Sequence, residues 1–376
     1  GSHKFADMKI SLLSVSAFVA LLFLLQSCEE HKLENKSDHS IGFEVLRFFR
    51  EAIPFFPDSL GIKDRPVFAR VWYPTEDSIN ALNFGSYFSE LNAEENYIKG
   101  DNQRALSLLR LHRLIRSFAD LDSGRVKKVI DSLYLTESGV SLSPSPSEGK
   151  YPLVIVAGGL PEYHLYLIEQ IASKGFVVAS IPRLGFSLSE RLPFDADGAT
   201  LVKEDLTHLV TELTKLEFVD ASQLFWVAWS YEGIPSLMAA TEFENTRAVI
   251  SLDASLGYSY GPSLLPDSVS FAATKFSFPI VHITGLTMDH GKSFSLLHSL
   301  SKHSLVKIIT IPKMSHAQFT SLKSAVIPSF SGRGPYTAYL QSTSLVFGLL
   351  NGSEVTEEIM RAMVSQDTTL RLLSVF

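Results

Sequence analysis

The chain has 376 residues, of which 45% are hydrophobic and 19% are charged, so it can bury one large core with or without an inserted cap. Its formal net charge is −7, and no basic stripe runs along it, which excludes the charge pattern typical of nucleic-acid-binding proteins. The single cysteine, Cys28, excludes an intrachain disulfide bond.

The first part of the chain has the pattern of an export signal. We expect residues 1–7 to precede the natural start at Met8. Lys9 then leads into an apolar run over 10–25, which ends at small and polar residues before Cys28. A short basic region followed by a short apolar region is typical of a secretory signal. The run is shorter than the ~20 residues that a membrane-spanning helix needs.

The ending Leu25-Gln-Ser-Cys28 resembles a bacterial lipobox, which is cleaved before a cysteine that becomes lipid-modified. This resemblance implies a signal peptide over 8–27, a lipidated Cys28 and a polar tether over 28–42. Several acyl chains on one cysteine would anchor the protein stably, at ~0.8 kcal/mol per buried CH₂ group. We therefore expect a bacterial envelope protein, held at the outer membrane and facing the periplasm or the surface. The alternatives are an uncleaved anchor helix and a signal peptide with an incidental cysteine.

The segment between the tether and residue 150 combines stretches with strand, helix and connector patterns. Residues 65–74 alternate between apolar and polar positions, which predicts a strand. Residues 83–138 carry helical spacing, and we expect a helical insert that caps the site, with peripheral packing at the sheet edge as the alternative. Residues 141–150 contain two prolines and predict a connector.

From residue 151 onward, predicted strands and helices alternate. Buried strands are expected over 151–156, 176–181, 224–229, 248–252, 279–284 and 306–311. Helices are expected over 162–174, 200–216, 234–240, 336–350 and 355–364. This alternation predicts an α/β fold over 43–376, with a mostly parallel sheet and helices on both faces.

A serine stands where the strand over 224–229 ends and a helix begins. Ser230 therefore has the position of the nucleophile in a strand–turn–helix elbow, where a strained turn exposes the hydroxyl. The usual pattern is Gly-x-Ser-x-Gly, but Ala228 and Glu232 replace both glycines, and Gly233 comes one place late. The carboxylate of Glu232 beside the nucleophile indicates either an altered enzyme or a relative without activity.

Two more polar residues follow strand ends. Asp253 comes directly after the strand over 248–252, and His316 comes shortly after the last predicted strand. Because the carboxyl ends of parallel strands share one edge of the sheet, we expect these side chains to meet Ser230. Asp289, after the next strand, remains an alternative to Asp253 as the acid. The other histidines lack metal-ligand spacing, so we expect neither a metal nor a cofactor.

The order Ser…Asp…His is that of α/β-hydrolases. The chain resembles the platelet-activating-factor acetylhydrolase group and its bacterial dienelactone-hydrolase-like relatives over residues 65–74 and 151–350. The matching segments are Trp72-Tyr-Pro74, Leu252-Asp-Ala254 (its aspartate 23 residues after the serine), His316-Ala-Gln-Phe319 and Gly158-Gly-Leu160, where those proteins often have His-Gly-Leu. The resemblance implies an α/β-hydrolase fold.

The resemblance also implies roles for individual residues. Ser230 would be the nucleophile, His316 the general base and then acid, and Asp253 the residue that orients the imidazole. The backbone N–H groups of Leu160 and Tyr231 would form the oxyanion hole.

These roles predict a lipid-anchored serine hydrolase that cleaves short acyl or acetyl esters through an acyl-enzyme. Its partners would be a small-molecule, lipid or glycan ester and, through Cys28, the membrane, with no nucleic acid. The oligomeric state is left open. The alternative is a binding lipoprotein on the same fold that has lost activity.

Overall fold

The computed structural model has two compact units, Gly1–Asp38 and His39–Phe376, and all residues that it describes belong to the second. The predicted signal peptide, Cys28, most of the tether and Asp289 lie outside the described residues. The described residues are 39–54, 64–77, 81–92, 109–113, 115–116, 123–135, 137–185, 192–266, 277–285, 291–311, 314–321, 346, 348, 350 and 371–375.

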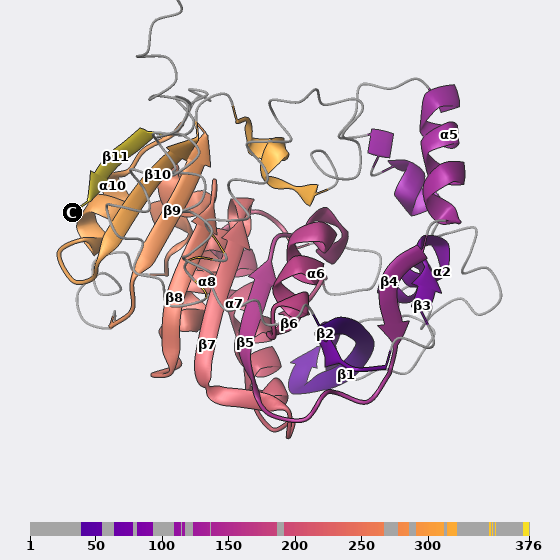
Figure 1. Cartoon of the computed structure of the whole chain (residues 1–376). Helices are drawn as coiled ribbons and strands as arrows, with labels where there is room; N and C mark the ends of the chain where they lie inside the picture. Colours follow the sequence, from indigo (N-terminus) through magenta and orange to yellow (C-terminus); the bar gives the residue numbers. More distant parts are fainter. Residues whose placement is uncertain are drawn as a thin grey trace, which may run out of the picture. The chain divides into compact units, whose positions relative to one another are not determined.

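In this described part, eleven strands form one sheet in the order β11-β10-β9-β8-β7-β5-β6-β2-β1-β4-β3 (Figure 1). Each of the six central strands runs parallel to its neighbours among them, which confirms the predicted mostly parallel sheet. These strands are β6 (Val177–Ser180), β5 (Tyr151–Ala157), β7 (Val219–Trp229), β8 (Thr246–Leu252), β9 (Ile280–Gly285) and β10 (Val306–Ile311).

The outer strands are largely antiparallel. On one side, β2 (Asp64–Thr75) pairs antiparallel with β6, and β1 (Ser40–Pro54) pairs antiparallel with β2. Beyond them, β4 (Glu137–Leu142) runs parallel to β1 and antiparallel to β3 (Ala81–Asn83). At the other edge, β11 (Arg371–Val375) runs antiparallel to β10.

Successive side chains along the strands point to opposite faces of the sheet, and they contribute to two apolar cores, one on each face. In β7, Phe225, Val227 and Trp229 enter the first core, whereas Leu224 and Trp226 enter the second. The first core includes α6 (Leu165–Ser173), and the second includes α7 (Ala196–Leu213), α8 (Gly233–Ala240) and α10 (Ser295–Leu300). Because both faces of β7 are covered, its end is rigidly placed, and the residue after it is fixed in position.

The insert differs from the purely helical prediction. It contains α2 (Phe84–Leu91) and α5 (Ser123–Tyr134), but β3 and β4 form an antiparallel pair at its two ends. The insert packs on the first core, and Arg110 forms an ion pair with the buried Glu162 at 2.8 Å. Glu162 belongs to the 3₁₀ turn Pro161–Tyr163 that follows β5. The insert is thus joined to the loop that precedes α6.

Several predicted boundaries differ from the structure, among them the start of β7 at Val219 instead of residue 224, and two of the differences have an identifiable cause. The tether was expected to reach residue 42, but β1 begins at Ser40 and pairs with β2 along most of its length. The paired residues lie between 10 positions (Pro54 and Asp64) and 35 positions (Ser40 and Thr75) apart, so the start of β1 at Ser40 depends on a distant partner. Helix α7 begins at Ala196 instead of residue 200, because the side chain of Asp195 caps it by accepting a hydrogen bond from the Gly198 N–H.

The two closing helices expected over 336–350 and 355–364 lie almost wholly outside the described residues. None of the helices in the described part of the chain combines the length and apolar character needed to cross a bilayer.

Candidate active site

Ser230 occupies a strained turn between β7 and α8. Its backbone φ is +60°, in the left-handed region that residues with side chains rarely adopt. Such strain costs roughly 1–3 kcal/mol and persists only where the surrounding structure enforces it. Here the fully buried Ala228 and the helix α8 hold the two sides of the turn. The geometry is that of a nucleophile elbow.

The close contact that requires glycine falls at Gly233 and not at Glu232. A Cβ atom at Gly233 would lie 2.7 Å from the side chains of Ala254 and Leu256, which is too close for any real contact. Glu232 has helical backbone angles and carries its side chain without such a conflict. The shifted glycine therefore compensates for the missing one, and the elbow forms despite its unusual sequence.

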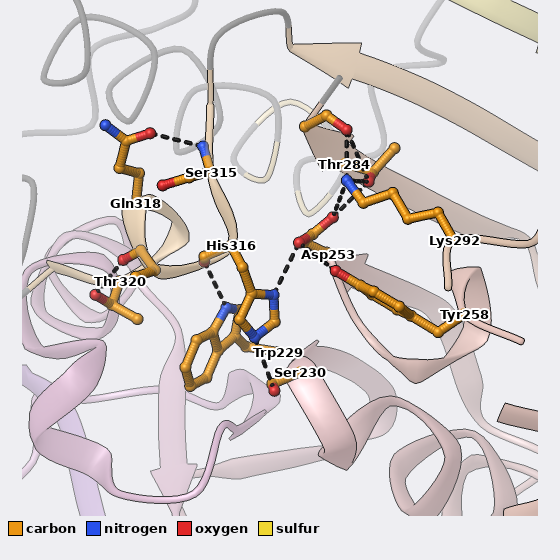
Figure 2. Close-up of polar contacts among 12 residues, drawn as sticks. Trp229, Ser230, Asp253, Tyr258, Thr284, Lys292, Ser315, His316, Gln318 and Thr320 are labelled. Atoms are coloured by element: carbon orange, nitrogen blue, oxygen red, sulfur yellow. Dashed lines mark hydrogen bonds and ion pairs between the residues drawn. The ribbon is translucent and has the colours of Figure 1, made fainter. Parts of the chain in front are cut away.

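The structure brings together the three side chains that the sequence analysis singled out (Figure 2). His316 Nε2 lies 2.9 Å from Ser230 Oγ, and His316 Nδ1 lies 2.8 Å from Asp253 Oδ2. Asp253 directly follows β8 and has a φ of +44°, so its turn is strained as well. The arrangement can transfer a proton from the serine to the imidazole, while the carboxylate stabilises the resulting cation. Asp289 lies outside the described residues, and Asp253 occupies the position of the acid.

Two aromatic side chains, Trp229 and Tyr258, contact the imidazole of His316. The Trp229 ring stacks on it with 4.8 Å between ring centroids and 22° between ring planes. Trp229 Nε1 also donates a hydrogen bond to the His316 carbonyl at 3.2 Å. Tyr258 approaches edge-on, with its centroid 6.2 Å away. Trp229, the residue before the nucleophile, thereby contacts the residue expected to act as its base.

Asp253 is fully buried and accepts several polar contacts besides the one with His316 (Figure 2). The Tyr258 hydroxyl donates to Oδ2 at 2.9 Å, the Thr284 hydroxyl donates to Oδ1 at 2.5 Å, and Lys292 Nζ lies 3.1 Å from Oδ1. Burial alone raises the pKa of Asp253, but the His316 hydrogen bond, the Lys292 charge and the Thr284 hydrogen bond together hold that pKa well below its usual range. Asp253 is therefore ionised at neutral pH.

Replacement of Lys292 by methionine is expected to lower the free energy of unfolding at pH 7 by about 3 kcal/mol, because it leaves a buried carboxylate without its cation. The Lys292 side chain is only 10% exposed. Since the pKa of Asp253 is lowered in the folded state, the stability from this pair is complete above the ordinary aspartate pKa of about 3.9 and declines as the pH falls below it. Urea unfolding of both proteins between pH 7 and pH 3 measures the difference.

The matched control for this prediction is Lys215→Met, which removes an exposed lysine from an ion pair with Glu212. Its effect should stay within about 0.5 kcal/mol. A Lys292→Met deficit of the same size at every pH would mean that the lysine contributes packing and not charge.

One predicted oxyanion donor is engaged elsewhere in this structure. The Leu160 N–H donates to the Gly158 carbonyl at 3.0 Å, so it is not available to an oxyanion in this conformation. The loop can change at Gly159, which has a φ of +80°. Tyr231, the other predicted donor, lies in the 3₁₀ turn Ser230–Glu232, directly after the nucleophile. An oxyanion hole with two donors therefore requires the Leu160–Gly158 hydrogen bond to open.

A buried histidine explains the glycine found where related sequences often have histidine. A Cβ atom at Gly158 would lie 2.2 Å from His164 Nε2, so only glycine fits. His164 is buried and lies edge-on to Trp229, 5.5 Å between centroids. Burial lowers the pKa of His164 to about 3, so the ring is neutral at physiological pH. The ring supports Trp229 and closes the space beside the loop.

Two hollows flank Ser230. The larger, about 540 Å³, is lined by the nucleophile and by Phe194, Asp195, Ala196, Tyr231, Tyr260, Ser263 and Leu264. The smaller, about 280 Å³, is lined by the nucleophile and by Gly159, Leu160, Tyr163, Arg183, Phe194, Trp229 and Glu232. All of these residues come from the loops at the carboxyl ends of β5, β6, β7 and β8 and from the start of α7, none from the described part of the insert. The described part of the insert thus lines neither hollow, and the predicted role of the whole insert as a cap stays a prediction.

Four residues of the site were missed in the sequence. Arg183 comes two residues after the predicted strand over 176–181, and applying the strand-end rule to it would have placed it at the site. Thr284 closes the strand after Asp253, and the same rule covers it. Tyr258 and Lys292 pair with each other in an isolated antiparallel β-bridge outside the strands, and their contacts with Asp253 follow no sequence pattern.

No protein-family model and no curated protein matches the chain. Among solved structures, it is similar to a ferulic acid esterase from Streptomyces cinnamoneus, with a TM-score of 0.57 and 14% identity over 84% of this chain and 90% of the esterase. A puromycin-hydrolyzing peptidase from Mycobacterium tuberculosis has a TM-score of 0.44 and 14% identity, covering 77% of this chain and 37% of the peptidase.

A dienelactone-hydrolase-like promiscuous phosphotriesterase from metagenomic libraries has a TM-score of 0.42 and 16% identity, covering 55% of this chain and 88% of that protein. The similarity to the esterase, together with the strand order, shows that the chain has the α/β-hydrolase fold, as the sequence predicted.

Proposed function

We propose that this chain is a serine hydrolase that cleaves carboxylic esters, lipid-anchored through Cys28. The observation that carries this proposal is the hydrogen-bonded relay from Ser230 Oγ through the His316 ring to Asp253, built on a serine in a strained elbow. A serine hydroxyl is a poor nucleophile until a base takes its proton, and this relay supplies the base and its orienting acid.

The reaction proceeds in two halves. His316 Nε2 accepts the Ser230 proton as Oγ attacks the ester carbonyl, and the same imidazolium then protonates the departing alcohol. Water next attacks the acyl-enzyme, with His316 again taking a proton, and the acid leaves as Ser230 regains its hydrogen. Asp253 stays ionised throughout. The Tyr231 N–H faces the developing oxyanion, and Leu160 joins it when its bond to Gly158 opens.

The hollows support a substrate with one small side. About 280 Å³ lies on one side of Ser230 and about 540 Å³ on the other, and the smaller value is at the lower limit for ligand pockets. One group of the ester therefore has to be short enough for the smaller hollow, and a larger group fits the other. The membrane anchor rests on the sequence alone, on the lipobox-like segment that ends at Cys28.

A fluorophosphonate probe tests the proposal, because it reacts only with an activated serine. We expect one adduct, located by mass spectrometry on the peptide that contains Ser230, and its loss in Ser230→Ala. Ser222→Ala, an exposed serine near the start of the same strand, is the matched control and should be labelled like the wild type. Folded protein that takes up no label at Ser230 would favour the alternative, a binding lipoprotein without activity.

A further inference from the structure

The smaller hollow beside Ser230 contains an arginine and a glutamate, and burial raises the pKa of that glutamate, Glu232, to about 7. Arg183 comes from the loop after β6, and Glu232 lies two residues after the nucleophile, where glycine is usual. Both side chains line the same hollow as Ser230. The proposed reaction uses neither of them.

These two side chains are buried, but their nearest polar atoms lie too far apart to form a hydrogen bond with each other. The Arg183 and Glu232 side chains are 9% and 6% exposed, and Arg183 Nε lies 3.9 Å from Glu232 Oε1. That distance is too long for a hydrogen bond. Among the described residues, Arg183 Nε, Arg183 Nη1 and Glu232 Oε1 have no hydrogen-bond partner. Leaving buried polar groups unsatisfied costs about 1–3 kcal/mol each, so a ligand that bonds to these atoms would be stabilised.

The guanidinium is held in place by contacts with aromatic rings, which do not use the N–H groups of Nε and Nη1. Arg183 Cζ lies 3.6 Å from the centroid of the Phe194 ring and 5.0 Å from that of Tyr231. The Arg183 backbone N–H donates to the Gly159 carbonyl at 3.1 Å, which ties the residue to the loop beside Ser230. The site is therefore organised before a ligand arrives, which reduces the entropy lost on binding.

The 3.9 Å gap suits a single hydroxyl group. A hydroxyl can donate to Glu232 Oε1 and accept from Arg183 Nε, with bonds of about 2.7 and 2.9 Å that meet at roughly 90° across this gap. Arg183 Nη1 then remains for a neighbouring oxygen. A carboxylate in the same place would be repelled by Glu232, and an ammonium group by Arg183. An apolar group would leave all three polar atoms unsatisfied.

We propose that Arg183 and Glu232 form a hydroxyl-binding subsite, so that the preferred substrates are esters of polyhydroxylated molecules, such as polyols or carbohydrates, or of hydroxylated acids. The inference rests on the proposed hydrolase activity and narrows its substrate class. Sites that hydrogen-bond a substrate hydroxyl reject the analogue that lacks it by factors of about 10⁴–10⁵ when fully enclosed. Because this hollow is partly open, we expect about 10²-fold.

Two matched pairs of esters test the proposal in the wild-type protein. Glycerol monoacetate against propyl acetate examines the alcohol side, and methyl 2,3-dihydroxypropanoate against methyl propanoate examines the acyl side. Each kcat/KM is divided by the rate of alkaline hydrolysis of the same ester, which removes intrinsic reactivity. We expect a preference of about 10²-fold for the hydroxylated member of at least one pair. Preferences below threefold in both pairs, the result if the gap binds only water, would overturn the proposal.

Two variants test whether Glu232 and Arg183 cause the preference for hydroxylated esters. Glu232→Gln removes the negative charge with little change of shape, and Arg183→Met removes the donors while retaining an unbranched side chain. We expect each to reduce the preference at least tenfold. Glu242→Gln, which alters an exposed glutamate paired with Lys203, is the control and should retain the preference. A preference that survives both site variants, in proteins whose Ser230 still takes the fluorophosphonate label, would refute the assignment to these residues.

The failures of the two proposals can be distinguished. If no ester is hydrolysed and Ser230 takes no label, the hydrolase activity and the subsite are both refuted. If esters are hydrolysed and Ser230 is labelled, but hydroxylated esters are not preferred, only the subsite is refuted.

Discussion

Replacement of Ser230 by alanine is expected to lower kcat for ester hydrolysis by about 10⁶-fold, because it removes the only atom in the relay that can bond to the acyl carbon. Substrate affinity should change little, since both hollows keep their other lining residues. Initial rates with glycerol monoacetate and the Kd of a phosphonate analogue measure the two effects.

The control for this prediction is the unfolding midpoint of the variant in urea, which separates lost chemistry from lost structure. A folded Ser230→Ala protein that retains more than about a hundredth of the wild-type kcat would exclude Ser230 as the nucleophile.

Replacement of Asp253 by asparagine is expected to lower kcat by about 10⁴-fold. The amide can donate to His316 Nδ1, which stabilises the wrong tautomer of the ring and removes the charge that supports the imidazolium. The change also leaves Lys292 beside a neutral group, so the free energy of unfolding should fall as well. Kinetics on the folded variant, checked by urea unfolding, measure the two losses separately.

Asp289→Asn is the matched control, because the sequence offers that residue as the alternative acid. We expect its kcat to stay within a few-fold of the wild-type value. A large loss in Asp289→Asn together with a small one in Asp253→Asn would reverse the assignment.

The central part of the fold was predictable because its signals are local. The six parallel strands are mostly apolar, and the strand predicted over 306–311 matches β10 at both ends. Ser230 and Asp253 follow their strands directly, so knowing the strands was enough to place them at one edge of the sheet. The prediction for the elbow was less secure, since two glycines are missing from it.

Other features depend on contacts between distant segments. The predicted tether extends too far because β1 is a strand only through its pairing with β2. The two short strands of the insert, β3 and β4, likewise depend on pairing with each other. Such strand pairings have no periodic signature in one chain. The predicted role of the Leu160 N–H differs for a local reason instead, because the loop geometry directs that amide to the Gly158 carbonyl.

The sequence by itself determined the order and type of the central strands and helices, and it brought Ser230, Asp253 and His316 to the carboxyl edge of one sheet, because hydrophobic periodicity and parallel connection are local rules. Only the tertiary structure decided that the contact requiring glycine falls at Gly233, that Lys292 faces Asp253, and that Arg183 Nε lies 3.9 Å from Glu232 Oε1. These facts depend on distances between residues far apart in the chain, and those distances arise only when the two cores pack.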